Sequence, residues 1–220
     1  MGGTRTHGSV RCIACRMHQA LCFCDLVPSL ASRARFVFVL HTAERWKTTC
    51  TGRIAAMGVQ GSELSYWVGR TKPFDPPVDL GSAAVLFPPR PDEPPALDAA
   101  EWVTEIEERG LRPTVVVPDG TWAQCRKMVG RHDDLQHLPR LQLPEGSAPR
   151  GGLRAECLTH GMSTIDAVAW LLSAIDGPDA GAPMAHLHRT MLERTMASRG
   201  TPLPGGPTMA DFPPLGQPDV

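Results

Sequence analysis

The chain has 220 residues, of which 42% are hydrophobic and 20% charged, and its formal net charge at pH 7 is −1. This length and composition indicate one soluble globular domain with extensions, and no apolar run is long enough to cross a bilayer. The near-neutral charge excludes a uniformly basic nucleic-acid binder, so any contact with nucleic acid must come from local basic patches. Residues 1–10 have no hydrophobic stretch that could act as a signal peptide. We therefore expect a disordered N-terminus over 1–10 and a cytoplasmic location.

A cluster of cysteines follows this N-terminus. Four of the seven cysteines fall within thirteen residues, at Cys12, Cys15, Cys22 and Cys24. In a chain without a secretion signal, the spacing Cys-x2-Cys-x6-Cys-x-Cys indicates a tetrahedral thiolate site for a metal, and Zn²⁺ suits four thiolates best. An iron–sulfur cluster or a redox pair is the alternative, although nothing nearby resembles an electron-transfer partner. Four protein ligands leave no open coordination position, so we expect a structural zinc knuckle over residues 11–28.

Strands and helices alternate in the next part of the chain. Residues 35–40, 63–68 and 83–87 have the apolar character of buried strands, and a loop followed by a short helix is expected within 45–59. Residues 96–109 form an amphipathic pattern with Leu97, Trp102 and Ile106 on the inner face, which predicts a helix. The order strand, helix, strand, helix predicts an α/β fold with a largely parallel sheet flanked by helices.

The most informative stretch begins at residue 114. Residues 114–117 are a β-branched run that predicts a buried strand, and we expect Pro118 to end it because proline has no N–H for a ladder. Asp119 places a carboxylate in the following turn, and Thr121 can cap a helix that begins near Trp122. Strand, tight turn and helix N-terminus form the usual ligand site of an α/β fold. The alternative is purely structural, with Asp119 a turn residue and Trp122 a core residue.

Two strands end in the same manner. Pro88 follows the strand at 83–87 as Pro118 follows the strand at 114–117. This repetition predicts two neighbouring loops at one edge of the sheet. Residues 138–143 are expected to form a further strand.

A helix is predicted over residues 162–172. Ser163 or Thr164 can cap it, and Asp166 lies in its first turn, where a carboxylate is favoured. Beyond residue 176 the chain is rich in Gly and Pro and allows one more helix near 184–198. These changes in composition predict a main domain over 29–176 and a helical extension with a flexible tail over 177–220.

Together and in this order, these motifs resemble the DTW-domain family. The resemblance covers about residues 11–176 and rests on five groups of residues. They are the four cysteines; Thr51-Gly52-Arg53; Leu86-Phe87-Pro88; Asp119-Gly120-Thr121-Trp122 with Arg126-Lys127-Met128; and Leu138-Pro139, Arg154 and Ser163-Thr164-Ile165-Asp166-Ala167. The chain departs from the family pattern at three places. Cys50 stands where Asn is usual, Met17-His18 where many members have Arg-Pro, and Asp166 where Glu is common.

The resemblance implies a fold and a reaction. DTW-domain proteins look like relatives of the SPOUT methyltransferases, which implies a SPOUT-like knotted parallel sheet and makes residues 29–176 the catalytic domain. Known members look like tRNA-uridine aminocarboxypropyltransferases. By this resemblance the chain would move the 3-amino-3-carboxypropyl group of S-adenosylmethionine to N3 of a tRNA uridine and release 5′-methylthioadenosine. The expected partner is tRNA, with no membrane and no obligate protein partner.

The resemblance also implies roles for individual residues. Asp119 would be the catalytic residue, as general base or as the acceptor that orients the uridine N3–H, or it would bind the amino group of S-adenosylmethionine. Contacts with S-adenosylmethionine are expected from Leu86, Phe87, Pro88, Asp119, Gly120, Thr121, Trp122, Arg154, Ser163, Thr164 and Asp166. Contacts with the tRNA backbone are expected from Lys47, Arg53, Arg126, Lys127 and Arg150.

Two other functions stay open. An S-adenosylmethionine-dependent RNA base methyltransferase could use the same kind of fold and would release S-adenosylhomocysteine. A non-enzymatic, zinc-dependent RNA-binding module would bind no S-adenosylmethionine. The near-neutral charge counts against the module because pure binders rely more heavily on phosphate neutralisation.

Overall fold

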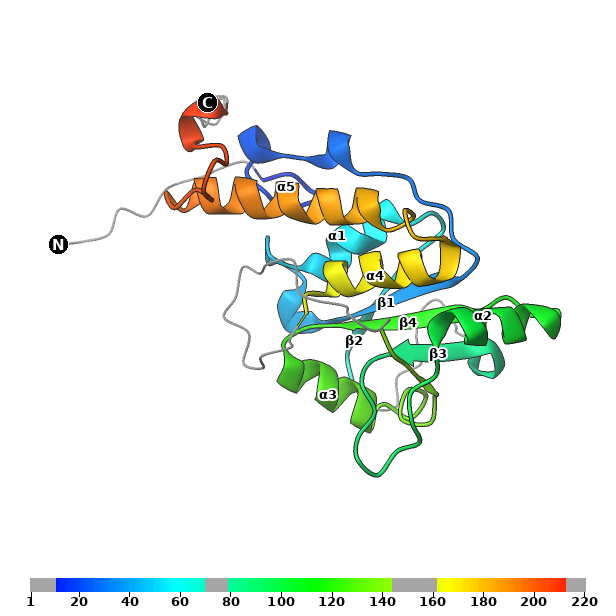
Figure 1. Cartoon of the computed structure of the whole chain (residues 1–220). Helices are drawn as coiled ribbons and strands as arrows, with labels where there is room; N and C mark the ends of the chain where they lie inside the picture. Colours follow the sequence, from blue (N-terminus) through cyan, green and yellow to red (C-terminus); the bar gives the residue numbers. More distant parts are fainter. Residues whose placement is uncertain (1–10, 70–78, 144–161, 213–220) are drawn as a thin grey trace.

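The computed structural model describes residues 11–69, 79–143 and 162–212, which contain a five-stranded parallel sheet (Figure 1). Its strand order is β2-β1-β4-β3-β5. The strands are β1 (Arg35–His41), β2 (Glu63–Trp67), β3 (Ala83–Leu86), β4 (Thr114–Asp119) and β5 (Arg140–Leu141). β1 is paired on both sides, with Val37 opposite Glu63 of β2 and Val116 of β4. Because a parallel sheet is covered on both faces, β1 and β4 consist almost entirely of buried residues.

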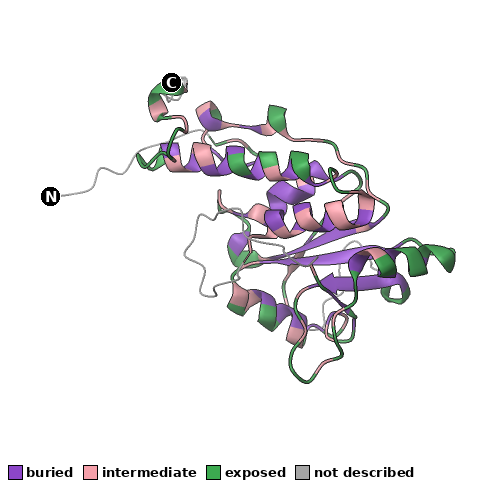
Figure 2. Ribbon diagram, in the orientation of Figure 1, coloured by how far each residue is buried: buried purple, intermediate pink, exposed green. Residues whose placement is uncertain are grey.

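Helices form a layer on each face of the sheet (Figures 1 and 2). They are α1 (Thr51–Gly58), α2 (Ala99–Glu108), α3 (Trp122–Arg131), α4 (Thr164–Asp176) and α5 (Ala182–Ser198). Side chains alternate along a strand, so the two faces receive different residues. Val37 and Val116 pack with Met128 of α3 on one face, whereas Phe38 and Val115 belong to the larger core beneath the other helices.

The expected α/β fold with a parallel sheet flanked by helices is confirmed. The first four strands form where the sequence predicts them, with ends that differ by one or two residues. The prediction that Pro118 ends its strand was wrong, because β4 continues with Pro118 opposite Val39 and Asp119 opposite Leu40 of β1. The ladder with β3 stops at Val116. One side of β4 is therefore unpaired at Pro118, and proline is tolerated where no ladder hydrogen bond is required.

Two predicted elements are shorter in the structure. The strand expected over 138–143 is reduced to the two residues of β5, and the helix expected from residue 96 begins at Ala99. Asp98 fixes this start, because its carboxylate accepts hydrogen bonds from the N–H groups of Ala100 and Glu101.

The N-terminal segment packs against α5. Met17 and Phe23 are buried in the same core cluster as Met184 of α5, and Arg194 of α5 donates a hydrogen bond to the carbonyl of Cys22. The helix predicted near 184–198 thus packs against α4 and holds the cysteine segment in place. These contacts join the two ends of the described chain.

Some expectations concern residues outside the described ranges, or properties that the described residues do not test. The N-terminus over 1–10, the end of the tail from residue 213, and Arg150 and Arg154 lie outside those ranges. The knotted chain path and the domain boundaries stay predictions. Within the described ranges, no helix has the length and apolar character needed to span a membrane.

Candidate active site and zinc centre

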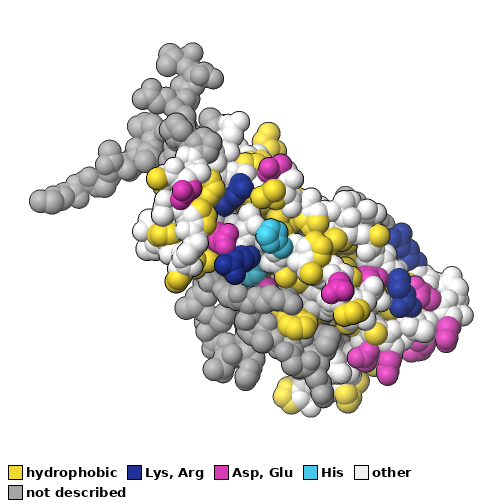
Figure 3. All heavy atoms as spheres, turned by 45° about the horizontal axis from the view of Figure 1, so that its top comes forward, with side chains coloured by type: hydrophobic (Ala, Val, Ile, Leu, Met, Phe, Trp, Pro, Cys, Tyr) yellow, Lys and Arg dark blue, Asp and Glu magenta, His cyan; other side chains and the backbone are white. Residues whose placement is uncertain are grey.

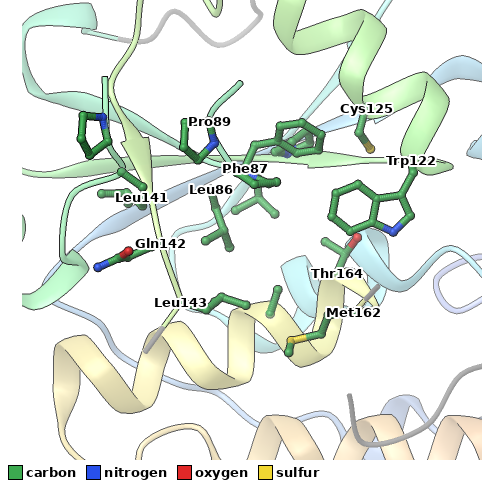
Figure 4. Close-up of a pocket in the computed structure, with 17 residues that line it drawn as sticks. Leu86, Phe87, Pro89, Trp122, Cys125, Leu141, Gln142, Leu143, Met162 and Thr164 are labelled. Carbon is green, nitrogen blue, oxygen red and sulfur yellow. The ribbon is translucent and has the colours of Figure 1, made fainter. Parts of the chain in front are cut away.

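A cavity of about 620 Å³ lies at the carboxyl ends of β3, β4 and β5, where α3 and α4 begin (Figure 4). This edge is where open parallel sheets bind ligands, and the cavity volume suits a molecule of cofactor size. The lining residues are Leu86, Phe87, Pro88, Pro89, Pro95, Ala96, Val117, Pro118, Gly120, Trp122, Cys125, Leu141, Gln142, Leu143, Met162, Thr164 and Ala167. None of these side chains carries a charge. The part of the cavity wall that these residues form therefore favours an apolar or planar part of a ligand.

Part of the predicted cofactor set lines this cavity. These residues are Leu86, Phe87, Pro88, Gly120, Trp122 and Thr164. The rings of Phe87 and Trp122 lie at one end, with their centroids 5.5 Å apart and their planes tilted by 44° (Figure 4). Trp122 is half-buried at the first turn of α3, so it forms part of the wall of the cavity. The two rings can hold a flat heterocycle.

Three other predicted cofactor residues organise the helix starts. Thr121 caps α3, because its hydroxyl accepts from the Gln124 N–H at 3.3 Å while the Gln124 side chain accepts from the Thr121 N–H at 2.8 Å. Ser163 caps α4 and donates to Asp166 at 3.1 Å. Asp166 is fully buried, and its other oxygen lies 2.8 Å from Nδ1 of His188 in α5. Asp166 therefore joins α4 to α5 and does not line the cavity.

The sequence reasoning missed the wall that β5 provides. Leu141, Gln142 and Leu143 line the cavity beside the end of β3. β5 pairs with β3, so the ends of these two strands lie next to each other. One signal was available in the sequence: Pro144 follows the predicted strand at 138–143 in the same way that Pro88 follows β3.

Asp119 lies behind the cavity wall. Only 4% of its surface is exposed, and its carboxylate accepts three hydrogen bonds. The donors are the Thr164 hydroxyl at 2.6 Å, the Gly52 N–H at 3.0 Å and the Cys50 thiol at 3.2 Å. Burial raises the pKa of the Asp119 carboxyl, and the three donors oppose that rise. Of these three donors, only Thr164 lines the cavity, so Asp119 is connected to the cavity through the Thr164 hydroxyl.

The turn that begins α1 is built against this carboxylate. A Cβ atom at Gly52 would lie 2.5 Å from Cβ of Asp119, so no larger residue fits without displacement. Cys50 occupies the position where the family usually has Asn. Burial raises the pKa of the Cys50 thiol, which keeps it protonated as a donor to Asp119. At this departure from the family pattern, the Cys50 thiol makes a polar contact with Asp119.

The four clustered cysteines come together as a possible metal site. The sulfurs of Cys12 and Cys24 are 3.5 Å apart, those of Cys15 and Cys22 are 3.8 Å apart, and all four lie within 4.8 Å of one another. A tetrahedron of Zn–S bonds of about 2.3 Å places its sulfurs about 3.8 Å apart, whereas a disulfide requires about 2.0 Å. The spacing therefore fits four thiolates around one metal ion.

The cations predicted to contact RNA divide into two groups. Lys47, Arg126 and Lys127 are exposed. Arg53 is buried, and its guanidinium donates to the carbonyls of Glu44, Arg45 and Lys47. Arg53 is therefore placed to fix the loop that carries Lys47, and a direct phosphate contact would require it to leave these partners. Arg150 lies outside the described residues.

A parallel sheet with a cofactor-sized cavity at its carboxyl edge and a four-cysteine cluster defines an α/β protein with a candidate ligand site and a candidate metal site. The chain belongs to the DTW domain family, whose domain it matches over residues 9–196. It is 22% identical, over 174 residues, to the tRNA-uridine aminocarboxypropyltransferase 2 of Macaca fascicularis. That match covers 75% of this chain and 56% of the relative, so the chain spans about half of the relative's length. No solved structure gives a significant match.

Proposed function

We propose that this chain is an S-adenosylmethionine-dependent tRNA-uridine aminocarboxypropyltransferase. It would transfer the 3-amino-3-carboxypropyl group to N3 of a tRNA uridine and release 5′-methylthioadenosine, acting in the cytoplasm. One observation carries the proposal: in a DTW-domain chain, the wall of the cavity contains a hydroxyl, from Thr164, that is bonded to a buried carboxylate, Asp119. The name of the distant relative, a tRNA-uridine aminocarboxypropyltransferase, supports the same reaction.

The cavity suits the co-substrate. Its apolar walls fit the adenosine of S-adenosylmethionine, and Phe87 and Trp122 can pack against the purine. The starts of α3 and α4 border the cavity, and helix N-termini favour a carboxylate such as that of the methionine moiety. Thr121 and Ser163 would support this binding by holding the helix starts in place. Arg154 stays a predicted partner of the same carboxylate.

The chemistry requires removal of the uridine N3 proton. S-adenosylmethionine supplies a carbon made electrophilic by its sulfonium, so a bond from N3 to that carbon forms as the carbon–sulfur bond breaks. We assign Thr164 to accept the N3 proton while its own hydroxyl proton passes to Asp119 across the 2.6 Å hydrogen bond. The raised pKa makes Asp119 a stronger base than an exposed aspartate. The predicted roles of Asp119 as direct base or as cofactor ligand would require its carboxylate to reach past Thr164.

The metal would have a structural role. We propose that Cys12, Cys15, Cys22 and Cys24 hold one Zn²⁺, whose four thiolates leave no position for a reactant. The site lies in the N-terminal segment that packs on α5, so the metal would stabilise that contact.

The proposal is tested by incubating the purified chain with S-adenosylmethionine and tRNA that lacks the modification, then weighing the nucleosides after digestion. A uridine heavier by one aminocarboxypropyl group, together with released methylthioadenosine, is the expected result. The Asp119→Asn variant should lose most of this activity, whereas Asp133→Asn, which changes an exposed carboxylate, should keep it. A uridine heavier by one methyl group, with S-adenosylhomocysteine released, would instead establish a methyltransferase. tRNA binding without any S-adenosylmethionine binding would establish an RNA-binding module.

A further inference from the structure

Aromatic and basic side chains alternate beside the carboxyl ends of β1 and β2. The guanidinium carbon of Arg16, in the cysteine segment, lies 4.7 Å from the centroid of the Trp46 ring. Arg45 lies 5.0 Å from the same ring and 5.1 Å from the ring of Tyr66. Trp46 is 65% exposed, which is unusual for tryptophan and leaves most of its surface free for a ligand.

The same pattern continues towards α3. Lys127 lies 5.8 Å from the ring centroid of Trp67, the last residue of β2, and the rings of Trp67 and His41 are 5.3 Å apart. His41 lies beside Gly120, which lines the cavity, because a Cβ atom at Gly120 would lie 3.3 Å from Cβ of His41. Tyr66 and Trp67 are consecutive in β2, so their side chains lie on opposite faces of the sheet. The alternating side chains therefore run from the cysteine segment around the carboxyl edge of the sheet to α3. We name them the aromatic-basic strip, which consists of Arg16, Arg45, Trp46, Tyr66, Trp67 and Lys127.

At α3 the strip meets a basic groove. A hollow of about 360 Å³ is lined by Arg90, Arg126, Lys127 and Arg131, together with Ala123 and Gly130. Arg90 is paired with Asp92 and Glu93, whereas Arg126, Lys127 and Arg131 are exposed on α3. In Figure 3, acidic side chains are most numerous at the right-hand end of the view, where Figure 1 places α2, and some Lys and Arg side chains lie among them. The three exposed cations of α3 favour a polyanion at the groove.

The backbone segments that carry Arg16 and Trp46 are held in position. Arg53 fixes the loop around Trp46 through bonds to the carbonyls of Glu44, Arg45 and Lys47. Arg16 has a φ of 65°, a conformation that non-glycine residues rarely adopt, and its N–H donates to the Cys12 carbonyl at 3.0 Å. Fixing the backbone of a binding segment in advance lowers the entropy cost of binding a partner.

We propose that the aromatic-basic strip binds a single-stranded segment of the RNA substrate, with a base stacked on Trp46 and phosphates in the groove along α3. This inference rests on the proposed function, and it places the nucleotide that enters the cavity between these two contacts. Single strands fit because every base offers a flat face to an aromatic ring while its phosphate meets a cation. A duplex hides its base faces, and a peptide of Asp and Glu alone has no rings to stack.

The test measures tRNA binding by fluorescence anisotropy in the absence of S-adenosylmethionine. Trp46→Ala should weaken binding by about tenfold or more, the effect of losing one base–aromatic stack, and Trp46→Phe should restore most of it. Lys127→Ala should lower the slope of log affinity against log salt by about one. The matched control is Arg112→Ala, an exposed cation just before β4 at the amino edge of the sheet. It should change neither quantity.

Two results would contradict RNA binding by the strip. Trp46→Ala with wild-type affinity, zinc content and thermal midpoint would overturn it, as would a duplex RNA or polyglutamate that displaces tRNA as well as a single-stranded RNA does. Failure of the proposed function is distinguishable, because it would show as Trp46-dependent tRNA binding without any modified uridine. In that case the RNA-binding role of the strip would be supported and the proposed reaction would be wrong.

Discussion

The Thr164 hydroxyl donates a 2.6 Å hydrogen bond to the Asp119 carboxylate, and this bond ties the first turn of α4 to the end of β4. Thr164 lines the cavity, whereas Asp119 is buried behind it. The Thr164 hydroxyl therefore connects a ligand in the cavity to the buried Asp119 carboxylate.

Replacing the hydroxyl tests this link. Thr164→Val keeps the shape of the side chain but removes the group that passes the proton. We expect the single-turnover rate of transfer at saturating S-adenosylmethionine to fall by about 10²-fold or more, with little change in S-adenosylmethionine affinity. Thr164→Ser, which keeps a hydroxyl, should recover most of the rate and the wild-type pH profile. A valine variant as fast as the wild type would show that the N3 proton leaves by another path.

Adding a methyl group at Gly52 should disturb the same carboxylate. The new Cβ would lie 2.5 Å from Cβ of Asp119, so Gly52→Ala must move α1 or β4. We expect a loss of about 1–3 kcal/mol in the free energy of unfolding, as for overpacked cores, together with lower activity. Gly58→Ala in the same helix is the control. Its Cβ would come closest to Cε of Met184, the end of a flexible side chain, at 2.8 Å, and the Met184 sulfur and Cγ of Pro28 would lie at 3.5 Å, an ordinary contact distance. The loss should therefore be smaller.

The ion pair between Arg140 and Glu93 should make the free energy of unfolding depend on pH. Hydrogen bonds from Arg140 lower the pKa of Glu93 to about 2 from its ordinary value of 4.5. A lowered pKa stabilises the fold above the unfolded-state pKa, and this contribution disappears as the pH falls from about 4.5 to 2. We expect Glu93→Gln to cost on the order of 2 kcal/mol at pH 7.

The measurement is a set of urea titrations of both proteins across that pH range. The difference in unfolding free energy should shrink steadily below pH 4.5. A difference that stays constant down to pH 2 would mean that the charge of Glu93 contributes nothing. Asp92→Asn is a suitable control, because the Asp92 side chain is 76% exposed and forms a 3.5 Å ion pair with Arg90.

Removing the metal should loosen the N-terminal segment. Cys12→Ser with Cys15→Ser deletes two of the four sulfur ligands, so we expect the zinc content to fall from about one ion per chain to near zero. The thermal midpoint should fall as well, because Met17 and Phe23 of this segment are buried against the core that includes α5. Cys125→Ser, at a cysteine outside the cluster, should leave the zinc content unchanged. A double variant with normal stability and full activity would contradict the structural role of the metal.

Local patterns in the sequence determined much of this protein. β-branched and apolar runs predicted the strands at Arg35 and Thr114 because such side chains suit a sheet that is buried on both faces. The spacing of the cysteines predicted their cluster because ligands so close in sequence can meet without help from the rest of the fold. The proline after β3 marked one wall of the cavity, since it marks the end of a strand at the ligand-binding edge.

Only the tertiary structure decided which of these residues face the cavity. Asp166 opens α4 as expected, but it turns to His188 of α5, and Arg53 turns inward to hold a loop. Asp119 likewise lies behind Thr164, which is 45 positions away in the chain. The wall from β5 depends on the pairing of β3 with β5. A side chain's direction at a helix start or strand end depends on which element packs there, and such contacts join residues too far apart for any local pattern to encode.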